Sequence, residues 1–301
     1  MAVGFGEAGR NAISFLISRT NNIHASRRTG HAWSCVGQHL KQGNLQMNLQ
    51  GKTIVITGAS SGIGGEVARL ARFNGARVIG VDRNDPMITL DGFVKMDLSD
   101  PAAIDTAISH LPAQIDGLVN AAGVPGTVDR DVVSKVNFLG LRHLTEALVP
   151  RMPKGASIVN FASILGAEWP HRVALHKELV ATTSFAEGLA WLAGHPVPQE
   201  TCYQYFKEAL IVWTMKRGHE LFLSHDVRMN SVAPGPVFTP ILGDFVTMLG
   251  QERVQRDAGL MKRPALADEI AGPVVFLCSD EARWVVGANL PIDGGVAAAG
   301  V

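Results

Sequence analysis

The sequence predicts an α/β fold in which a single doubly wound parallel sheet carries helices on both faces. Three observations indicate it: short β-branched runs alternate with segments of helical periodicity, a glycine-rich turn follows the first run, and an aspartate ends the second. Continuous apolar runs are typical of strands buried on both faces, as in parallel sheets. We expect one domain of about 250 residues, because α/β folds often reach that length undivided.

The first predicted strand, Thr53–Thr57 (TIVIT), is almost entirely β-branched, and the helix after it ends at Asn74-Gly75, a common stop signal. The second strand stops at Asp82, and Pro264 precedes the last helix. The predicted strands are Thr53–Thr57, Arg77–Val81, Phe93–Met96, Gly117–Asn120, Ser157–Ala162 and Arg228–Ala233. The predicted helices are Glu66–Phe73, Ile104–Leu111, Arg130–Pro150, Tyr203–Ser224 and Leu266–Cys278.

Residues 1–46 differ from the rest of the chain, with five basic residues against one acid, Glu7. They lack the apolar core and small-residue cleavage site of a secretory signal, and they faintly resemble an Arg-rich mitochondrial presequence. We favour a different interpretation, in which Met47, directly before the first strand, is the biological start and residues 1–46 are a disordered leader. The catalytic domain is then expected to span residues 47–301.

Composition excludes several function classes. The 27 basic residues balance 27 acidic ones, so the chain lacks the basic surplus of a nucleic-acid-binding protein. No apolar run approaches the ~18 residues that a membrane span needs. The three cysteines are distant and odd in number, which favours a reducing compartment and a cytoplasmic location. His171 and His176 belong to no metal-binding motif, so we expect no metal site.

A glycine loop, Gly58-x3-Gly62-x-Gly64, joins the first strand to the first helix. Glycines there allow a sharp turn and let backbone N–H groups approach a pyrophosphate, as in Rossmann-type nucleotide sites, although an ordinary tight turn is the alternative. Asp82 stands 24 residues after Gly58 and can accept hydrogen bonds from an adenosine ribose while repelling a 2′-phosphate. Arg83 could pair with that phosphate. We therefore expect NAD rather than NADP.

A tyrosine and a lysine supply candidate acid–base chemistry for hydride transfer. Of the two tyrosines, only Tyr203 has a lysine four residues on, and Tyr203 and Lys207 share a helix face that Tyr205 does not. An ammonium ~4 Å away at an effective dielectric of ~20 is worth about 4 kcal/mol to a phenolate. This would lower a tyrosine pKa from ~10 towards 7, and burial would oppose part of that shift. Ser163, after a strand, could hold the substrate oxygen, although a local cap is the alternative.

Because these motifs and several further segments occur together, the chain resembles the short-chain dehydrogenase/reductase family. The matching segments are Thr57–Gly64 (TGASSGIG), Asp97-Leu98, Asn120–Gly123 (NAAG), Asn137, Ser163, Tyr203 with Lys207, Pro234–Thr239 (PGPVFT) and Asp293–Gly295. The resemblance implies that Ser163, Tyr203, Lys207 and Asn137 are catalytic, with Asn137 holding a water that relays protons from Lys207, and that Thr239 binds the nicotinamide carboxamide. The implied cofactor-binding residues are Gly58, Ser61, Gly62, Ile63, Gly64, Asp82, Asp97, Leu98, Asn120, Ala121, Gly123, Tyr203, Lys207, Pro234, Gly235, Val237 and Thr239.

The chain departs from the family in placing Ser163 40 residues before Tyr203 instead of about a dozen, which predicts an insertion at Gly166–Glu200 with a helix around His176–Leu192. This longer form resembles 3α-hydroxysteroid dehydrogenase/carbonyl reductase and, more closely, bacterial coniferyl-alcohol dehydrogenases. The segments that carry the closer resemblance are Gly80–Asn84 (GVDRN), Leu165–Pro170 (LGAEWP), Cys202–Trp213 (CYQYFKEALIVW) and Pro234–Leu242 (PGPVFTPIL).

The resemblance implies an NAD-dependent dehydrogenase that oxidises coniferyl-type aromatic allylic alcohols to aldehydes. A hydroxysteroid or carbonyl substrate is the alternative, and a nucleotide-binding regulator that lost turnover is the non-enzymatic one. Aromatic residues and a methionine could wall the substrate pocket or fill the core: Trp169, Trp191, Phe238, Phe245 and Met248.

An apolar stripe on the insertion must be covered by something. Leu179, Phe185, Leu189 and Leu192 recur at helical spacing, and a lone helix cannot bury such a stripe. It would pack beside the cleft as a substrate wall or against a second subunit. We favour a homodimer, with a homotetramer as the alternative, in which the insertion contributes to the contact.

Overall fold

The computed structural model describes residues 47–300, and the predicted leader, residues 1–46, lies outside them. The described chain builds one seven-stranded sheet in which every pair of neighbouring strands is parallel, in the order β3-β2-β1-β4-β5-β6-β7. Its strands are β1 (Thr53–Thr57), β2 (Arg77–Asp82), β3 (Gly92–Lys95), β4 (Gly117–Asn120), β5 (Ser157–Phe161), β6 (Arg228–Pro234) and β7 (Asn289–Ile292). The expected Rossmann-type doubly wound sheet is confirmed.

The strand order reverses beside β1. The chain runs outward from β1 to β3, returns to β4 on the other side of β1, and then runs outward again to β7. Thr57 at the end of β1 pairs with Val81 on one side and Asn120 on the other. Ligands of open α/β sheets bind at such a switch point, beyond the carboxyl ends of the strands. The fold therefore opens a crevice where the glycine loop leaves β1.

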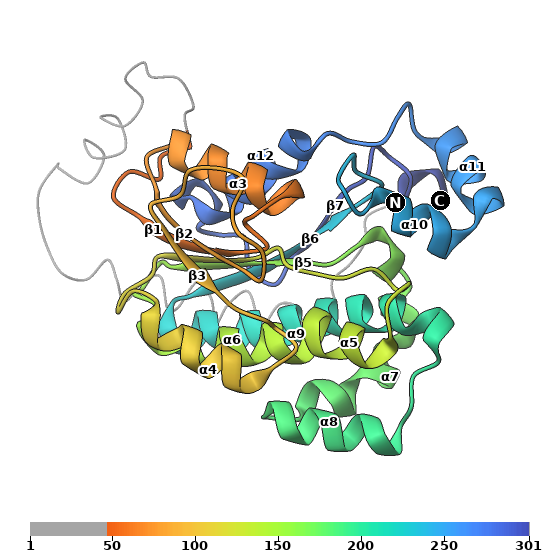
Figure 1. The fold of residues 1–301 in the computed structure, drawn as a ribbon, viewed down its shortest axis with the longest axis horizontal. Coiled ribbons are helices and arrows are strands. Elements are labelled where there is room, and N and C mark those ends of the chain that lie inside the picture. The colour runs from red at the N-terminus through yellow and green to blue at the C-terminus, as the bar shows by residue number, and fades with distance from the viewer. Residues whose placement is uncertain (1–46, 301) are drawn as a thin grey trace, which may run out of the picture. The chain divides into compact units, whose positions relative to one another are not determined.

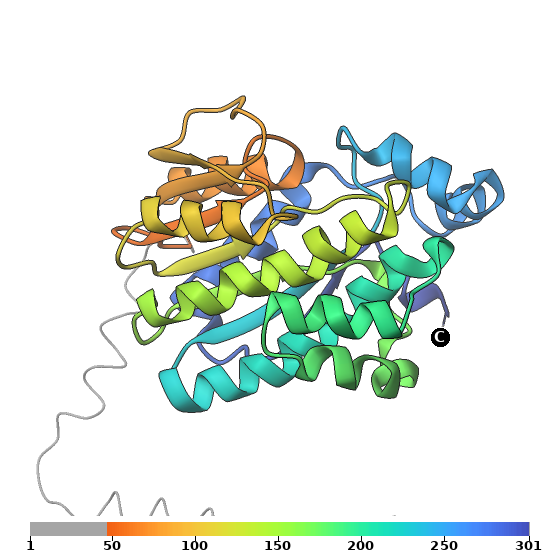
Figure 2. The ribbon, with the colours of Figure 1, turned by 60° about the horizontal axis from the view of Figure 1, so that its bottom comes forward.

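Helices cover both faces of the sheet (Figures 1 and 2). One face carries α3 (Gly62–Phe73) and α12 (Ala267–Cys278), which pack against each other. The other face carries α4 (Pro101–His110), α5 (Arg130–Ser134), α6 (Leu141–Leu148) and α9 (Cys202–His225). Two further helices, α10 (Leu242–Leu249) and α11 (Gln251–Leu260), lie beyond one end of the sheet.

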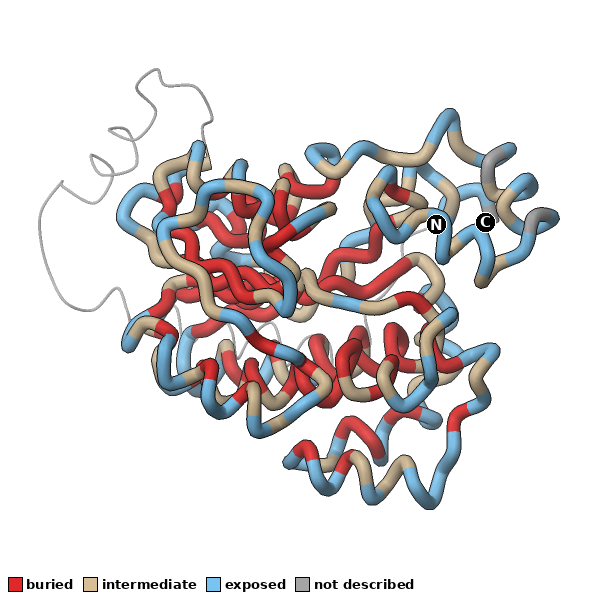
Figure 3. Tube along the Cα trace, viewed as in Figure 1, coloured by how far each residue is buried: buried red, intermediate tan, exposed pale blue. Residues whose placement is uncertain are grey.

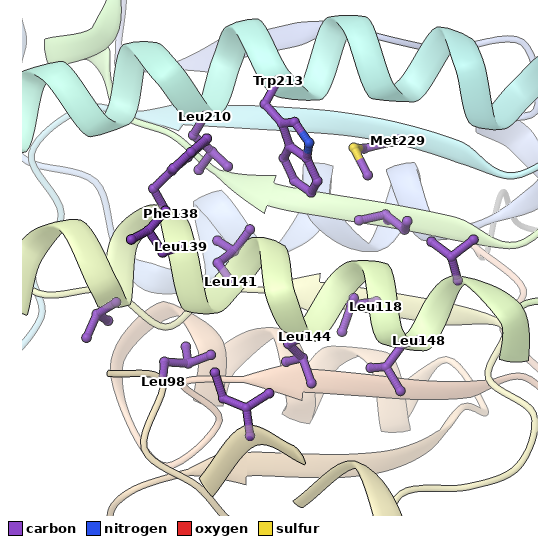
Figure 4. Packing of buried hydrophobic residues seen from close by; sticks show 14 of the residues in the cluster. Leu98, Leu118, Phe138, Leu139, Leu141, Leu144, Leu148, Leu210, Trp213 and Met229 are labelled. Carbon is purple, nitrogen blue, oxygen red and sulfur yellow. The ribbon is translucent and has the colours of Figure 1, made fainter. Parts of the chain in front are cut away.

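The core lies in two layers, one on each face of the sheet, and the buried tube segments follow the strands (Figure 3). In the larger layer, leucines of α6 and the side chains of Leu210 and Trp213 on α9 converge over β4 (Figure 4). Leu144 and Leu148 are fully buried there. Truncating a leucine in such a site to alanine costs about 2–5 kcal/mol, so this packing fixes α9 on the sheet.

The predicted helix Arg130–Pro150 is interrupted. After α5 the chain forms a π-helical segment, η1 (Lys135–Gly140), before α6 begins. A Cβ on Gly140 would lie 1.9 Å from the backbone oxygen of Leu98, so only glycine allows this close approach. Single π-turns inside helices are frequently found at functional sites. Periodicity along the chain could not reveal this segment, because the contact that Gly140 makes there is with a distant loop.

The insertion folds into two helices instead of the one predicted around His176–Leu192. Helix α7 (Trp169–Ala181) ends before Thr182, and α8 (Phe185–Gly194) begins after Ser184, whose hydroxyl accepts a hydrogen bond from the Glu187 amide at 3.1 Å. Ser184 is therefore an N-cap in the middle of the expected helix. The buried Arg142 of α6 fixes the turn, because its guanidinium donates to the backbone oxygens of Thr182 (2.7 Å) and Ser184 (3.0 Å).

The apolar stripe of the insertion packs on its own chain. Leu179 is fully buried and Phe185 is 5% exposed, within the layer formed by α6 and α9. The insertion residues beyond Leu165 do not line either cavity described below, so this segment does not form the substrate wall that was the alternative to a subunit contact. Phe185 is equally unsuited to a contact with a second subunit, because its side chain is already covered.

Three elements were not predicted: α10, α11 and the edge strand β7. Apart from the interrupted helix Arg130–Pro150 and the divided insertion, the other strands and α-helices agree with the predicted ones to within a few residues at their ends. The largest of these differences is at α3, which begins at Gly62 instead of Glu66. Within residues 47–300 no helix is both long and apolar enough to cross a membrane.

Candidate active site

Two adjoining cavities open at the carboxyl edge of the sheet. The smaller, of about 230 Å³, follows the glycine loop and the ends of β1, β2 and β4. The larger, of about 430 Å³, lies between the ends of β5 and β6 and the helices α10 and α11. Ile63, Gly123 and Thr239 line both. A ligand with a nucleotide end and a reactive end could therefore extend from one cavity into the other.

The glycine loop is built for close approach. Gly58 has φ +70°, and a Cβ there would lie 2.8 Å from the Ala122 amide nitrogen. Gly62 has φ +57°, and a Cβ on Gly64 would lie 2.2 Å from the Gly58 oxygen. Helix α3 starts at Gly62 and its cap, Ser61, makes no side-chain capping bond. The loop thus presents a helix N-terminus without side chains in the way, which suits a pyrophosphate.

Asp82 lies at the end of β2 and lines the smaller cavity. One carboxylate oxygen accepts a hydrogen bond from the Ser60 amide (3.1 Å), and the other accepts one from the Asn84 amide (3.0 Å). Each oxygen retains acceptor capacity for a ribose hydroxyl. Arg83 also lines this cavity, is exposed, and forms no ion pair with any residue in the described part of the chain.

The structure brings nearly all the predicted cofactor residues to the two cavities. Those lining one or both are Gly58, Ser61, Gly62, Ile63, Gly64, Asp82, Asp97, Leu98, Ala121, Gly123, Tyr203, Lys207, Pro234, Gly235, Val237 and Thr239. Asn120 is the exception. Its amide is buried under the sheet and donates to Thr145 Oγ1 (3.0 Å) and Asn160 Oδ1 (2.8 Å), so it ties β4 to α6 and β5.

Asn137 fixes the loop after β4 from within the π-helical segment. Its side-chain oxygen accepts from the Val124 amide and its nitrogen donates to the Val124 oxygen, both at 2.9 Å. A Cβ on Gly123 would lie 3.4 Å from Asn137 Oδ1 and 3.8 Å from Lys207 Nζ, so the lysine, the asparagine and this loop meet at one place. The amide of Asn137 is therefore occupied in positioning the loop between the two cavities.

Tyr203, Lys207 and Ser163 line the larger cavity together. Tyr203 and Lys207 are one turn apart on α9, and Lys207 Nζ lies 5.5 Å from the centre of the Tyr203 ring. Ser163 follows β5, accepts a hydrogen bond from the Leu165 amide (3.2 Å), and thus combines the capping role with a place in the cavity. Tyr205 points elsewhere and its hydroxyl donates to the Leu175 oxygen (3.1 Å).

Burial controls the protonation of the pair. It raises the pKa of Tyr203 well above the ordinary value, an effect that a hydrogen bond with Ser163 partly offsets. It also lowers the pKa of Lys207 to about 8. The sequence-based expectation of a tyrosine pKa near 7 is therefore not met, because loss of hydration on burial raises the pKa of Tyr203. The ammonium of Lys207 is held by the backbone oxygen of Phe161 at 2.5 Å.

The wall of the larger cavity is apolar and comes largely from the segment that holds α10, α11 and the residues beside them, and neither helix was predicted from the sequence. Phe245 packs edge-on against the Tyr203 ring, with centroids 5.2 Å apart. The other apolar residues from this segment are Ile241, Leu242, Val246, Leu249, Val254 and Met261. Of the five suggested wall residues, Phe245 lines the cavity, whereas Trp169, Trp191, Phe238 and Met248 do not. The apolar spacing of α10 was the available signal.

A buried cluster of charged and polar side chains beside Lys207 on α9 was not predicted from the sequence. Glu208 is fully buried next to Lys207 and accepts hydrogen bonds from His176 Nε2 (2.7 Å), Arg172 (3.2 Å) and Gln204 (3.0 Å). Its partners His176 and Arg172 belong to α7, so the cluster fastens the insertion to α9. Among residues 47–300 no group of three or more His, Cys, Asp or Glu side chains is placed to hold a metal ion.

The two adjoining cavities bring the glycine loop and Asp82 together with Tyr203, Lys207 and Ser163, the arrangement expected of a dinucleotide-dependent oxidoreductase. A sequence model described as enoyl-(acyl carrier protein) reductase matches residues 58–297. The chain is 61% identical over 251 residues to coniferyl-alcohol dehydrogenase of Pseudomonas sp. (strain HR199 / DSM 7063), covering 83% of this chain and 98% of that protein. The chain belongs to the short-chain dehydrogenase/reductase family and is an oxidoreductase that acts on CH–OH groups.

Solved structures show the same relation. The 3-alpha-hydroxysteroid dehydrogenase from Pseudomonas sp. B-0831, complexed with NADH, matches with a TM-score of 0.68 at 26% identity, over 82% of this chain and 97% of that one. The 3-ketoacyl-(acyl-carrier-protein) reductase from Brucella melitensis, also complexed with NADH, matches with a TM-score of 0.63 at 26% identity, over 83% and 99%. These similarities support the resemblance stated from the motifs.

Proposed function

We propose that this protein is an NAD-dependent dehydrogenase that oxidises coniferyl-type aromatic allylic alcohols to aldehydes. The observation that carries the proposal is the larger cavity, in which Tyr203, Lys207 and Ser163 face an apolar wall headed by Phe245. A flat aromatic substrate suits such a wall, and edge-to-face contacts between aromatic rings add to the burial of apolar area. The 61% identity to a coniferyl-alcohol dehydrogenase supports the same substrate class.

The chemistry assigned to the chain is proton transfer. Tyr203 in its phenolate form takes the proton of the substrate hydroxyl and becomes a phenol, while Ser163 holds the substrate oxygen. Lys207 supplies the positive charge that stabilises the phenolate before this step. Asn137 positions the loop next to Lys207. In the proton relay that the family resemblance implies, Asn137 also holds a water that carries the proton away from Lys207. Bound NAD supplies the hydride acceptor and a positive charge. The apolar wall excludes water, which strengthens each of these interactions.

The smaller cavity supports NAD over NADP. Asp82 offers two carboxylate oxygens to ribose hydroxyls and would repel a 2′-phosphate. The cradle formed by Gly58, Gly62 and Gly64 fits a pyrophosphate because any Cβ at Gly58 or Gly64 would collide with backbone atoms. Arg83 is the residue that could favour NADP, because it lines the same cavity.

The test is an oxidation assay with coniferyl alcohol and with a 3α-hydroxysteroid, each with NAD and with NADP. The hydroxysteroid is included because of the structural similarity to a 3-alpha-hydroxysteroid dehydrogenase. We expect turnover of coniferyl alcohol with NAD to exceed the other three combinations. A preference for the steroid would replace the proposed substrate, and a preference for NADP would make Arg83 a phosphate ligand.

Two matched variants on α9 test the mechanism. Tyr203→Phe keeps the ring and removes the hydroxyl, so we expect turnover to fall by at least about a hundredfold while NAD affinity stays nearly unchanged. Tyr205→Phe is the control, because its hydroxyl is bonded to Leu175 outside the cavity. Turnover by Tyr203→Phe close to that of the unmodified protein would show that another group is the base. Complete lack of turnover in the unmodified protein, with NAD bound, would favour a nucleotide-binding regulator.

The cytoplasmic location and the homodimer remain predictions. Sedimentation equilibrium decides the second, and a homotetramer is the alternative. Because Phe185 is covered within its own chain, a contact surface on the insertion would have to use its exposed side chains.

A further inference from the structure

One carboxylate stands out in the wall of the larger cavity. Asp257 of α11 lines it, and its side chain is only 14% exposed. The nearest cationic atoms are Nε of Arg256 at 3.5 Å and Nε of Arg253 at 3.6 Å, and neither contact is a hydrogen bond. No group in the described part of the chain donates a hydrogen bond to it. A largely buried carboxylate normally accepts several, so this one has unused acceptor capacity.

The surroundings of Asp257 make that capacity available to a ligand. Its neighbours in the wall include the apolar residues Leu249, Val254 and Met261. The cavity-lining Arg263 is engaged elsewhere, because its guanidinium binds both oxygens of Glu269 at 2.6 and 2.8 Å. Outside the group formed by Ser163, Tyr203, Lys207 and Thr239, Asp257 is therefore the only hydrogen-bond acceptor side chain among the described residues of this wall.

We propose that Asp257 accepts a hydrogen bond from the phenolic hydroxyl of the substrate and so determines specificity for 4-hydroxylated rings. This inference rests on the proposed function. Coniferyl alcohol carries its carbinol and its phenol at opposite ends, and the cavity presents Tyr203 of α9 beside Ser163, which follows β5, and Asp257 on α11. A phenol with a pKa near 10 is protonated at neutral pH and donates to a carboxylate. Bonds to charged acceptors in water-poor sites are among the stronger ones.

A purely structural role makes a different prediction. Asp257 and Arg253 are one turn apart on α11, so the carboxylate could act only as a helix-stabilising partner. Removing it would then weaken α11 and the cavity wall, and all substrates would lose turnover alike. The two roles are separated by comparing coniferyl alcohol with its 4-O-methyl ether, which differs only at the ring hydroxyl, and with cinnamyl alcohol, which lacks both the ring hydroxyl and the methoxy group.

The experiment measures kcat/KM for coniferyl alcohol, its 4-O-methyl ether and cinnamyl alcohol with Asp257→Leu. Asp244→Leu is the control, because Asp244 is an exposed acid on the neighbouring α10 and does not line the cavity. For Asp257→Leu we expect kcat/KM for coniferyl alcohol to fall about ten- to a hundredfold, mainly through KM, with less than a threefold change for the other two. The control should change none of them.

Equal losses for all three substrates, or no loss for coniferyl alcohol, would overturn the assignment of Asp257. Binding provides a second readout that does not need turnover. In a Tyr203→Phe background we expect coniferyl alcohol to bind more tightly than cinnamyl alcohol by calorimetry, and Asp257→Leu to abolish that preference. If the unmodified protein oxidises none of these alcohols, the proposed function fails, but the binding measurement still tests the role of Asp257. A preference for coniferyl alcohol that remains in the Asp257→Leu variant refutes the role of Asp257 as acceptor.

Discussion

Replacing the buried lysine should stabilise the protein while removing its activity. Lys207 is 4% exposed on α9, and burial lowers its pKa from 10.5 to about 8. At neutral pH the folded protein therefore holds a charge in a site that disfavours it. Lys207→Met keeps most of the side-chain volume and removes the charge. A residue that is costly to folding and useful to catalysis is a known form of trade-off between stability and activity.

The magnitude follows from the pKa. At 1.36 kcal/mol per pKa unit, a fall from 10.5 to about 8 corresponds to about 3 kcal/mol of lost stability at pH 7. The substitution also removes the hydrogen bond from Nζ to the Phe161 oxygen, and leaving that oxygen without a donor costs about 1–2 kcal/mol. We expect Lys207→Met to raise the free energy of unfolding by about 1–2 kcal/mol at pH 7.

The pH dependence is the sharper part of this prediction. Because the folded-state pKa is lower than the unfolded one, the unfolded chain binds more protons between about pH 8 and pH 10.5, and stability rises with pH there. The unmodified protein gains this contribution and Lys207→Met does not. The difference between them should therefore close by about 2 kcal/mol from pH 7 to pH 9.5.

Urea unfolding at pH 7 and pH 9.5, followed by far-ultraviolet circular dichroism, measures that difference. Lys216→Met serves as control, because Lys216 is exposed on the same helix and its loss should leave the pH dependence as in the unmodified protein. A stability difference between Lys207→Met and the unmodified protein that stays constant with pH would refute the reasoning.

Three further predictions concern the cofactor, the insertion and the glycine loop. Asp82→Ala should weaken NAD binding about tenfold and reduce the preference for NAD over NADP, because the ribose acceptor and the repulsive charge disappear together. Fluorescence titration with both cofactors measures the two affinities, and an unchanged preference for NAD would contradict the role assigned to Asp82. Arg142→Met should destabilise the protein by about 3 kcal/mol and speed amide exchange in residues 176–190, because the buried guanidinium holds the turn between α7 and α8. Hydrogen-exchange mass spectrometry measures this effect, and extra exchange spread over the whole domain would contradict the prediction. Gly64→Ala should cost several kcal/mol and abolish NAD binding, because its Cβ would lie 2.2 Å from the Gly58 oxygen; a variant with unchanged stability would refute the close approach.

The sequence by itself determined the parts of this protein that depend on neighbours along the chain. β-Branched runs such as Thr53–Thr57 marked strands, because burial on both faces selects such residues wherever the strand pairs. The i, i+4 spacing put Tyr203 and Lys207 on one helix face, and the same geometry sent Tyr205 away from the cavity. The spacing of Gly58, Gly62 and Gly64 likewise predicted the turn between β1 and α3, because a tight turn depends on neighbours along the chain.

Tertiary structure decided what depends on distant partners. The π-helical segment lies where Gly140 meets the backbone of Leu98, and the insertion divides where Arg142 of α6 binds the turn at Thr182. The wall formed by α10 and α11 joins the site only because the fold brings these helices over Tyr203. Tertiary structure also decides the protonation of the pair. Residue spacing places Lys207 near Tyr203, whereas burial, which raises the pKa of Tyr203 and lowers that of Lys207, is a property of the folded environment.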